Sequence, residues 1–231
     1  MIEEFKRPLS LVEATMDGIR SSIINGELSL GQQLTENYLQ KTFGFSKTPI
    51  REALAQLKAE GIVVSEVHKG FRVFKMDEQE LFEFCELRLA LESQALRSAY
   101  KNNRLELVKG LKILIKDLKV SIKKNDFVKY NLIDSKYHKS FFILSSNRFL
   151  IKHYENINSI IETIRTHSIQ GLVDKDKLTD SNNGHILIHK NIEEKNLTLA
   201  LHELDKHINS WFDDRIIKSR LTSYKKNLLL K

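Results

Sequence analysis

Apolar residues recur at helical spacing along most of this chain, and alternation typical of strands is confined to one short region. The first sixty residues have the pattern of three helices. One covers 9–25, a short second helix is capped by Thr35 and ends at Thr42, and a third lies between Ser46 and Gly61. Ser and Thr are good N-cap residues and glycine commonly follows a helix end, so these boundaries have local causes.

A β-hairpin is predicted directly after the third helix. The runs 62–64 and 71–74, rich in β-branched and aromatic residues, flank His68-Lys69-Gly70, which supplies the turn. Three helices followed by a hairpin predict a winged helix-turn-helix, in which the hairpin is the wing and the only β structure.

From Met76 onward the pattern is helical and predicts an all-α antiparallel bundle of about six helices. The expected helices lie near 78–101, 104–124, 126–145, 147–168, 181–195 and 197–218. The expected N-caps are Asp77, Asp126, Asn147 and Ser181, and one expected break is Asn102-Asn103. The sequence thus predicts a mainly α protein with two domains, 1–75 and 76–231.

Composition excludes several classes of protein. The 231 residues, 41% of them hydrophobic, can form a core in each domain, and no apolar run approaches the length of a membrane span. The single cysteine, Cys85, excludes a disulfide framework and fits a cytoplasmic location. The net charge of +7 does not itself indicate DNA binding, because residues 1–75 carry ten Lys and Arg against nine Asp and Glu.

The third helix carries the candidate DNA contacts. Its apolar positions are Ile50, Leu54 and Leu57. On the other side lie Lys47, Thr48 and Arg51. A short helix with a polar tip, set after a turn, is what helix-turn-helix proteins insert into the major groove. In the wing, Lys69 and Arg72 could contact phosphates or the minor groove, or belong to a plain exposed hairpin tip.

The stretch GELSLGQQL, followed by LQKTFGFSKTPIREALAQLKAEGIV, resembles the N-terminal domain of GntR-type bacterial transcription regulators over residues 8–75. Its most specific parts are S-K-T-P-I-R-E-A-L and L-x-x-E-G. The resemblance implies a double-stranded DNA operator as partner, with contacts from Thr35, Asn37, Ser46, Lys47, Thr48, Arg51, Lys69 and Arg72. The FadR branch of this family commonly uses three arginines, and the matching positions here hold Asn37, Lys47 and Arg51. Lys lacks the bidentate fork of Arg, so the operator sequence does not carry over.

In the bundle, polar residues fall on apolar helix faces. Asp134 and His138 lie on one stripe of the helix over 126–145, among apolar neighbours. Burying a carboxylate and an imidazole is costly unless each is paired or bound. The pair alone fits a hydrogen bond within the helix as well as it fits a metal site. His185 and His207, on two further helices, could complete a site of one Asp and three His, although His189 competes with His185.

The spacing D-x-x-x-H, then His185, then His207, is similar to the FCD ligand-binding domain of the FadR branch, over about residues 78–220. The short form of that domain, in the VanR-like group, has about six helices. The resemblance implies one divalent metal per chain, held by Asp134, His138, His185 and His207 and leaving out His189. Zinc is the first choice, and nickel, iron or manganese also suit such ligands.

An arginine also falls on a core-facing stripe. Arg88 lies in line with Leu81, Phe84 and Ala95, and a buried guanidinium needs an anion. The anion could be Glu92 within the same helix, in the family pattern R-x-x-x-E, or the carboxylate of a small organic acid effector held jointly with the metal. Arg165 could serve the same pocket.

These observations predict a homodimeric, ligand-responsive transcription regulator, a repressor that binds a palindromic operator. A metal-dependent hydrolase is the alternative from another class, but the run HILIH over 185–189 lacks the glutamate that a zinc protease needs. A purely structural metal is a third possibility.

Overall fold

The computed structural model describes residues 10–66, 70–169 and 175–210. The chain divides into two compact units. Unit 1 comprises Met1–Lys75 together with Asn156–His167, and unit 2 comprises Met76–Glu155 together with Ser168–Lys231.

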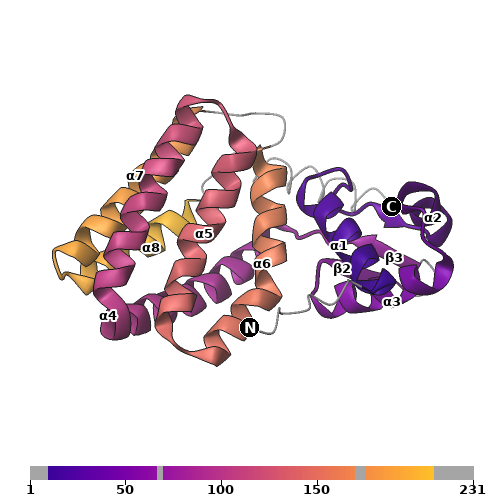
Figure 1. Ribbon diagram of the computed structural model, residues 1–231, viewed down its shortest axis with the longest axis horizontal. Coiled ribbons are helices and arrows are strands. Elements are labelled where there is room, and N and C mark those ends of the chain that lie inside the picture. The colour runs from indigo at the N-terminus through magenta and orange to yellow at the C-terminus, as the bar shows by residue number, and fades with distance from the viewer. Residues whose placement is uncertain (1–9, 67–69, 170–174, 211–231) are drawn as a thin grey trace, which may run out of the picture. The chain divides into compact units, whose positions relative to one another are not determined.

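Unit 1 has the elements of a winged helix-turn-helix (Figure 1). In chain order they are α1 (Leu11–Ile24), β1 (Gln33–Leu34), α2 (Glu36–Phe43), α3 (Lys47–Ala59), β2 (Val63–Glu66) and β3 (Gly70–Val73). Its core is formed by fully buried side chains of the three helices, which include Ile19, Ile23, Leu39, Ile50, Leu54 and Leu57. The apolar positions predicted for the third helix, Ile50, Leu54 and Leu57, are therefore its packed face.

Local signals set the ends of these helices. Thr35 caps α2 as predicted, because its hydroxyl accepts the N–H of Tyr38 at 3.2 Å. Gly44 ends α2 with a φ of 74°, a left-handed conformation that favours glycine. Ser46 occupies the N-cap position of α3, but its side chain makes no capping hydrogen bond.

The prediction that only the hairpin is β was wrong. The sheet has three antiparallel strands in the order β1-β3-β2, and Gln33 and Leu34 pair with Arg72 and Phe71. A strand of two residues is too short to show alternation, so no pattern in the sequence reveals it. It forms because the outer edge of β3 offers backbone hydrogen bonds that the loop before α2 is placed to fill.

Within its described residues, unit 2 consists of helices joined by short turns, and α6 belongs partly to each unit (Figure 1). The helices are α4 (Glu78–Lys123), α5 (Phe127–Ser145), α6 (Arg148–Ile169), α7 (Lys175–Glu193) and α8 (Leu197–Asn209). Helix α4 packs along α5 and also contacts α7 and α8. One buried cluster of unit 2 consists of Leu118, Ile122, Tyr130, Ile133 and Leu178. Three helices thus share one apolar core.

Two predicted helix boundaries differ from the structure. The expected break at Asn102-Asn103 is a kink inside α4, where Asn103 has φ −143° and ψ 37°. Both Asn side chains donate to backbone carbonyls at the end of α5, which holds the kink in place. Helix α7 begins at Lys175, so Ser181 lies inside it and is not its cap. The part of the last predicted helix beyond Ser210 lies outside the described residues.

Candidate functional site

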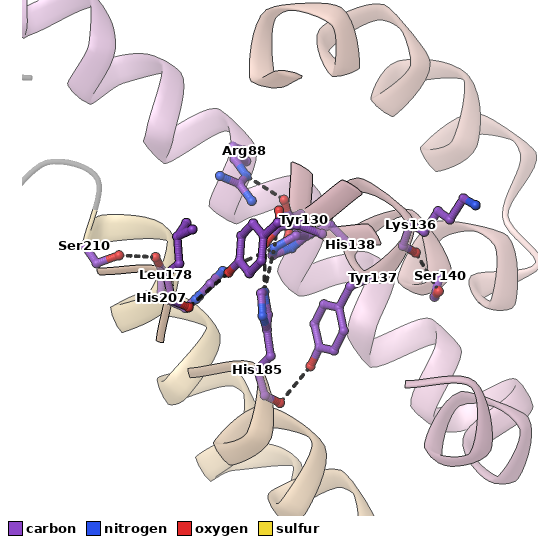
Figure 2. Close-up of polar contacts among 12 residues, drawn as sticks. Arg88, Tyr130, Lys136, Tyr137, His138, Ser140, Leu178, His185, His207 and Ser210 are labelled. Carbon is purple, nitrogen blue, oxygen red and sulfur yellow. Dashed lines mark hydrogen bonds and ion pairs between the residues drawn. The ribbon is translucent and has the colours of Figure 1, made fainter. Parts of the chain in front are cut away.

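Four buried side chains from three helices converge in unit 2. Asp134 and His138 come from α5, His185 from α7 and His207 from α8, and each offers one ligand atom within 4.8 Å of the others. The Nε2 atom of His138 lies 3.2 Å from that of His207 and 3.4 Å from that of His185. Figure 2 shows the three rings turned toward one another.

The spacing of these atoms fits a single metal ion. Ligands bound to zinc at 2.0–2.1 Å are about 3 to 3.4 Å apart, and the Nε2 atom of His138 has this spacing to the Nε2 atoms of both His185 and His207. The carboxylate of Asp134 is 3.3 Å from Nε2 of His185 and 3.9 Å from Nε2 of His138. Three imidazoles and one carboxylate could therefore hold a divalent transition metal with small adjustments of the side chains.

Glu92 of α4 holds His138 in the orientation that such a site requires. One carboxylate oxygen of Glu92 is 2.6 Å from Nδ1 of His138, and both side chains are fully buried. A carboxylate can only accept a hydrogen bond, so Nδ1 of His138 carries a proton, and Nε2 is the ring nitrogen left to face the cluster and bind a metal. Sequence reasoning missed this role, because Glu92 and His138 are 46 residues apart.

The other oxygen of Glu92 pairs with Arg88. The Nε–H of Arg88 donates to it at 2.6 Å, and both side chains are fully buried. Burial alone would lower the pKa of Arg88, but the charge and hydrogen bond of Glu92 outweigh that effect and raise it. Of the two anions considered for Arg88, the structure has Glu92 in place. The contact with an effector stays a prediction.

Burial keeps His207 in its neutral form. It lowers the pKa of this imidazole well below 6.5, and the nearby His185 and His138 lower it further. A neutral imidazole has a free lone pair, which is the form that binds a metal. Tyr137 supports the neighbouring ligand, because its hydroxyl donates to the backbone oxygen of His185 at 3.0 Å and the two rings lie 4.3 Å apart.

His189 lies outside the cluster. Its Nε2 is 3.1 Å from the carbonyl oxygen of Val108 on α4. His185 and His189 are one turn apart and both are buried, so helical periodicity alone does not separate them. Arg165 is buried in the part of α6 that groups with unit 1, and its assignment to the effector pocket stays a prediction.

In unit 1 the predicted DNA contacts on the helices are exposed. They are Thr35, Asn37, Ser46, Lys47, Thr48 and Arg51. Arg51 pairs with Glu36 of α2, a partner that the sequence did not indicate. In the wing, the half-buried Arg72 pairs with Glu66 at 2.9 Å, and Lys69 lies outside the described residues. Helix α3 therefore presents a polar surface opposite its buried face.

Taken together, the winged helix-turn-helix and the helical unit with its buried Asp and His cluster define a class of protein, the DNA-binding regulators with a second, helical domain. Residues 11–73 match the bacterial regulatory proteins of the gntR family, and residues 83–210 match the FCD domain. The chain belongs to the GntR family of transcription regulators and carries an FCD domain; it is not an enzyme.

Relatives and solved structures are consistent with this assignment. The chain is 30% identical over 199 residues to the gluconate operon transcriptional repressor of Bacillus licheniformis, covering 85% of this chain and 79% of that protein. The McbR/YncC structure from E. coli has the same fold, with a TM-score of 0.75, 19% identity, and coverage of 92% of this chain and 99% of that one. The metal-free FCD domain of TM0439 matches with a TM-score of 0.54 and 22% identity, over 64% of this chain and 99% of that one.

In the part of the chain that the structure describes, none of the helices has an apolar stretch that could span a lipid bilayer.

Proposed function

We propose that this chain is a homodimeric repressor whose affinity for a palindromic operator is set by a small organic acid bound at a metal site. Residues 1–75 would contact DNA, and residues 76–231 would bind the effector and form the dimer. The observation that carries the proposal is the convergence of four ligand atoms within 4.8 Å inside the helical unit, beside a buried arginine. The similarity to the gluconate operon transcriptional repressor of Bacillus licheniformis supports repression over activation.

The proposed metal is held by Asp134, His138, His185 and His207. Zinc is the first candidate, with nickel, iron or manganese as alternatives, because imidazole and carboxylate suit all four. Because four side chains already fill a tetrahedral site, an anionic ligand would bind the metal only where the metal accepts more than four ligands. Glu92 orients the ring of His138 with Nε2 toward the cluster, and burial lowers the pKa of His207, which favours the neutral form that binds a metal.

The proposed effector is a small carboxylate. Arg88 brings a permanent positive charge to the core of the unit. That charge interacts electrostatically with the side chains of both Asp134 and His207. A carboxylate bound to the metal would add a further anion, beside Glu92 and Asp134, within reach of this charge, which favours organic acids over neutral sugars. Arg165 remains a second candidate contact for the same ligand.

On the DNA side, Arg51 is the proposed base contact of α3, with Lys47 and Thr48 as neighbours in the major groove. Thr35, Asn37 and Ser46 would contact the backbone, and Lys69 and Arg72 of the wing would contact phosphates or the minor groove. One such helix buries too little surface for specific binding, so two copies on half-sites about one DNA turn apart are expected. A regulator of this kind acts in the cytoplasm, where its operator is.

A single set of titrations tests the proposal. The purified chain is analysed for bound metals, loaded with zinc, and titrated calorimetrically with a panel of small carboxylates and with matched neutral sugars. Binding of at least one acid, coupled to a change in operator affinity, is expected. If metal-loaded protein binds none of the acids, the effector part is wrong. If chelation lowers the melting temperature and no ligand dependence appears, the metal is structural.

A further inference from the structure

Helix α7 contains a glycine at a position where glycine weakens a helix. Gly184 lies well inside Lys175–Glu193 and directly precedes His185. Glycine loses more backbone entropy than alanine when it becomes helical, so an interior glycine usually has a packing reason. No turn or left-handed conformation accounts for it, because the residue is in the middle of a continuous helix.

The space next to Gly184 is occupied by a side chain of α8. A Cβ atom at this position would lie 2.9 Å from Nδ1 of His207, 3.5 Å from its Cγ and 3.6 Å from its Cβ. The first of these distances is shorter than carbon and nitrogen atoms tolerate, so the ring or the helices would have to shift. By contrast, an added Cβ at Gly110, which is also inside a helix, would meet no atom within 4 Å.

The ring of His207 has little freedom to give way. It is 7% exposed, and its centroid lies 4.3 Å from that of His185 and 5.1 Å from that of His138, with which it is stacked. A displacement that relieves the contact with α7 therefore moves its Nε2 relative to the other two Nε2 atoms. The Nε2 atom of His138 now lies 3.2 Å from that of His207 and 3.4 Å from that of His185, which is the spacing of ligands on one ion.

We propose that Gly184 is a positioning residue for the metal site: the absence of its side chain lets the ring of His207 stand where its Nε2 meets the other ligands. Gly184 itself touches no metal. The inference rests on the proposed metal site, and it assigns a function to a residue that carries no chemistry of its own. It also explains why α7 has glycine rather than a better helix former next to a ligand.

The packing contact between Gly184 and His207 is tested on four metal-free full-length proteins. They are the wild type, Gly184→Ala, His207→Ala and the double variant. The substitution Gly184→Ala should lower the melting temperature in the presence of His207. In the His207→Ala background the same substitution should leave the melting temperature unchanged or raise it, because the ring is gone and alanine favours the helix. A change of the same sign and size in both backgrounds overturns the proposal.

The metal half uses cobalt as the probe. Gly184→Ala should bind Co²⁺ at least about tenfold more weakly than wild type, as outer-shell substitutions do, and its visible absorption spectrum should change because the coordination is altered. Gly110→Ala is the matched control and should equal wild type in both. Wild-type affinity together with an unaltered spectrum in Gly184→Ala overturns the positioning role.

Failure of the proposed function is distinguishable from failure of this inference. If the wild-type chain binds no cobalt, zinc, nickel, iron or manganese, the metal site is refuted. The melting comparison of the four metal-free chains then still decides whether Gly184 sets the place of His207.

Discussion

Replacing Glu92 by glutamine should destabilise the helical unit and weaken its metal site together. The carboxylate of Glu92 receives two charged hydrogen bonds of 2.6 Å, from Arg88 and from His138, and all three side chains are fully buried. Glutamine has nearly the same shape but no charge. It can accept from only one of the two donors, and its amide N–H₂ group faces the other.

The expected magnitude follows from burial of the ion pair. Removing one partner of a buried pair leaves the other charge uncompensated, which costs about 3 to 5 kcal/mol. A domain is commonly stable by only about 5 to 15 kcal/mol, so the loss is a large part of the total. If the amide group faces His138, the proton of that imidazole moves to Nε2, where it blocks the lone pair that binds the metal. A loss of metal affinity of about 10- to 100-fold is then expected.

Urea unfolding of the metal-free protein, followed by circular dichroism, measures the first effect, and metal titration of the folded protein measures the second. The matched control is Glu86→Gln, because Glu86 is an exposed glutamate on the same helix α4. That change should stay within about 0.5 kcal/mol of wild type. If Glu92→Gln is no more destabilising than Glu86→Gln, the structural reasoning about the buried pair is refuted.

Three further predictions concern the ligands, the DNA contact and pH. His185→Ala should reduce bound metal by elemental analysis while His189→Ala retains it, because only His185 points into the cluster; the opposite result would exchange their roles. Arg51→Ala should weaken operator binding in a gel-shift assay by more than about tenfold with an unchanged circular dichroism spectrum, whereas the exposed Lys58→Ala at the far end of α3 should have little effect. The metal-free helical unit should lose stability in urea as the pH falls below about 6.5. The pKa of His207 is lower when folded than when unfolded, so the unfolded chain takes up the proton first, and stability falls by at most about 1.4 kcal/mol per pH unit until the folded pKa is reached. His207→Ala should remove this part of the pH dependence, and an unchanged dependence would contradict the assignment.

The sequence by itself determined most of the helices and their inward faces, for a local reason. A helix places residues three and four apart on one side, so the stripes of α3 and α5 can be derived without knowing what they pack against. The caps Thr35 and Asp126 act over only three residues and were equally accessible. The same logic placed Asp134 and His138 on one buried face.

Only the tertiary structure decided which distant groups meet. His138 lies 47 residues from His185 and 69 from His207, and no local spacing determines that its Nε2 atom comes within 3.4 Å of both of theirs. Whether His185 or His189 belongs to the cluster depends on α4, because the ring of His189 contacts the carbonyl oxygen of Val108 there. The strand β1 forms because one edge of β3 is free to pair with it. Gly184 matters only because the ring of His207 on α8 lies where a side chain at this position would be. Periodicity fixes which way a side chain faces, whereas packing between helices fixes what it faces.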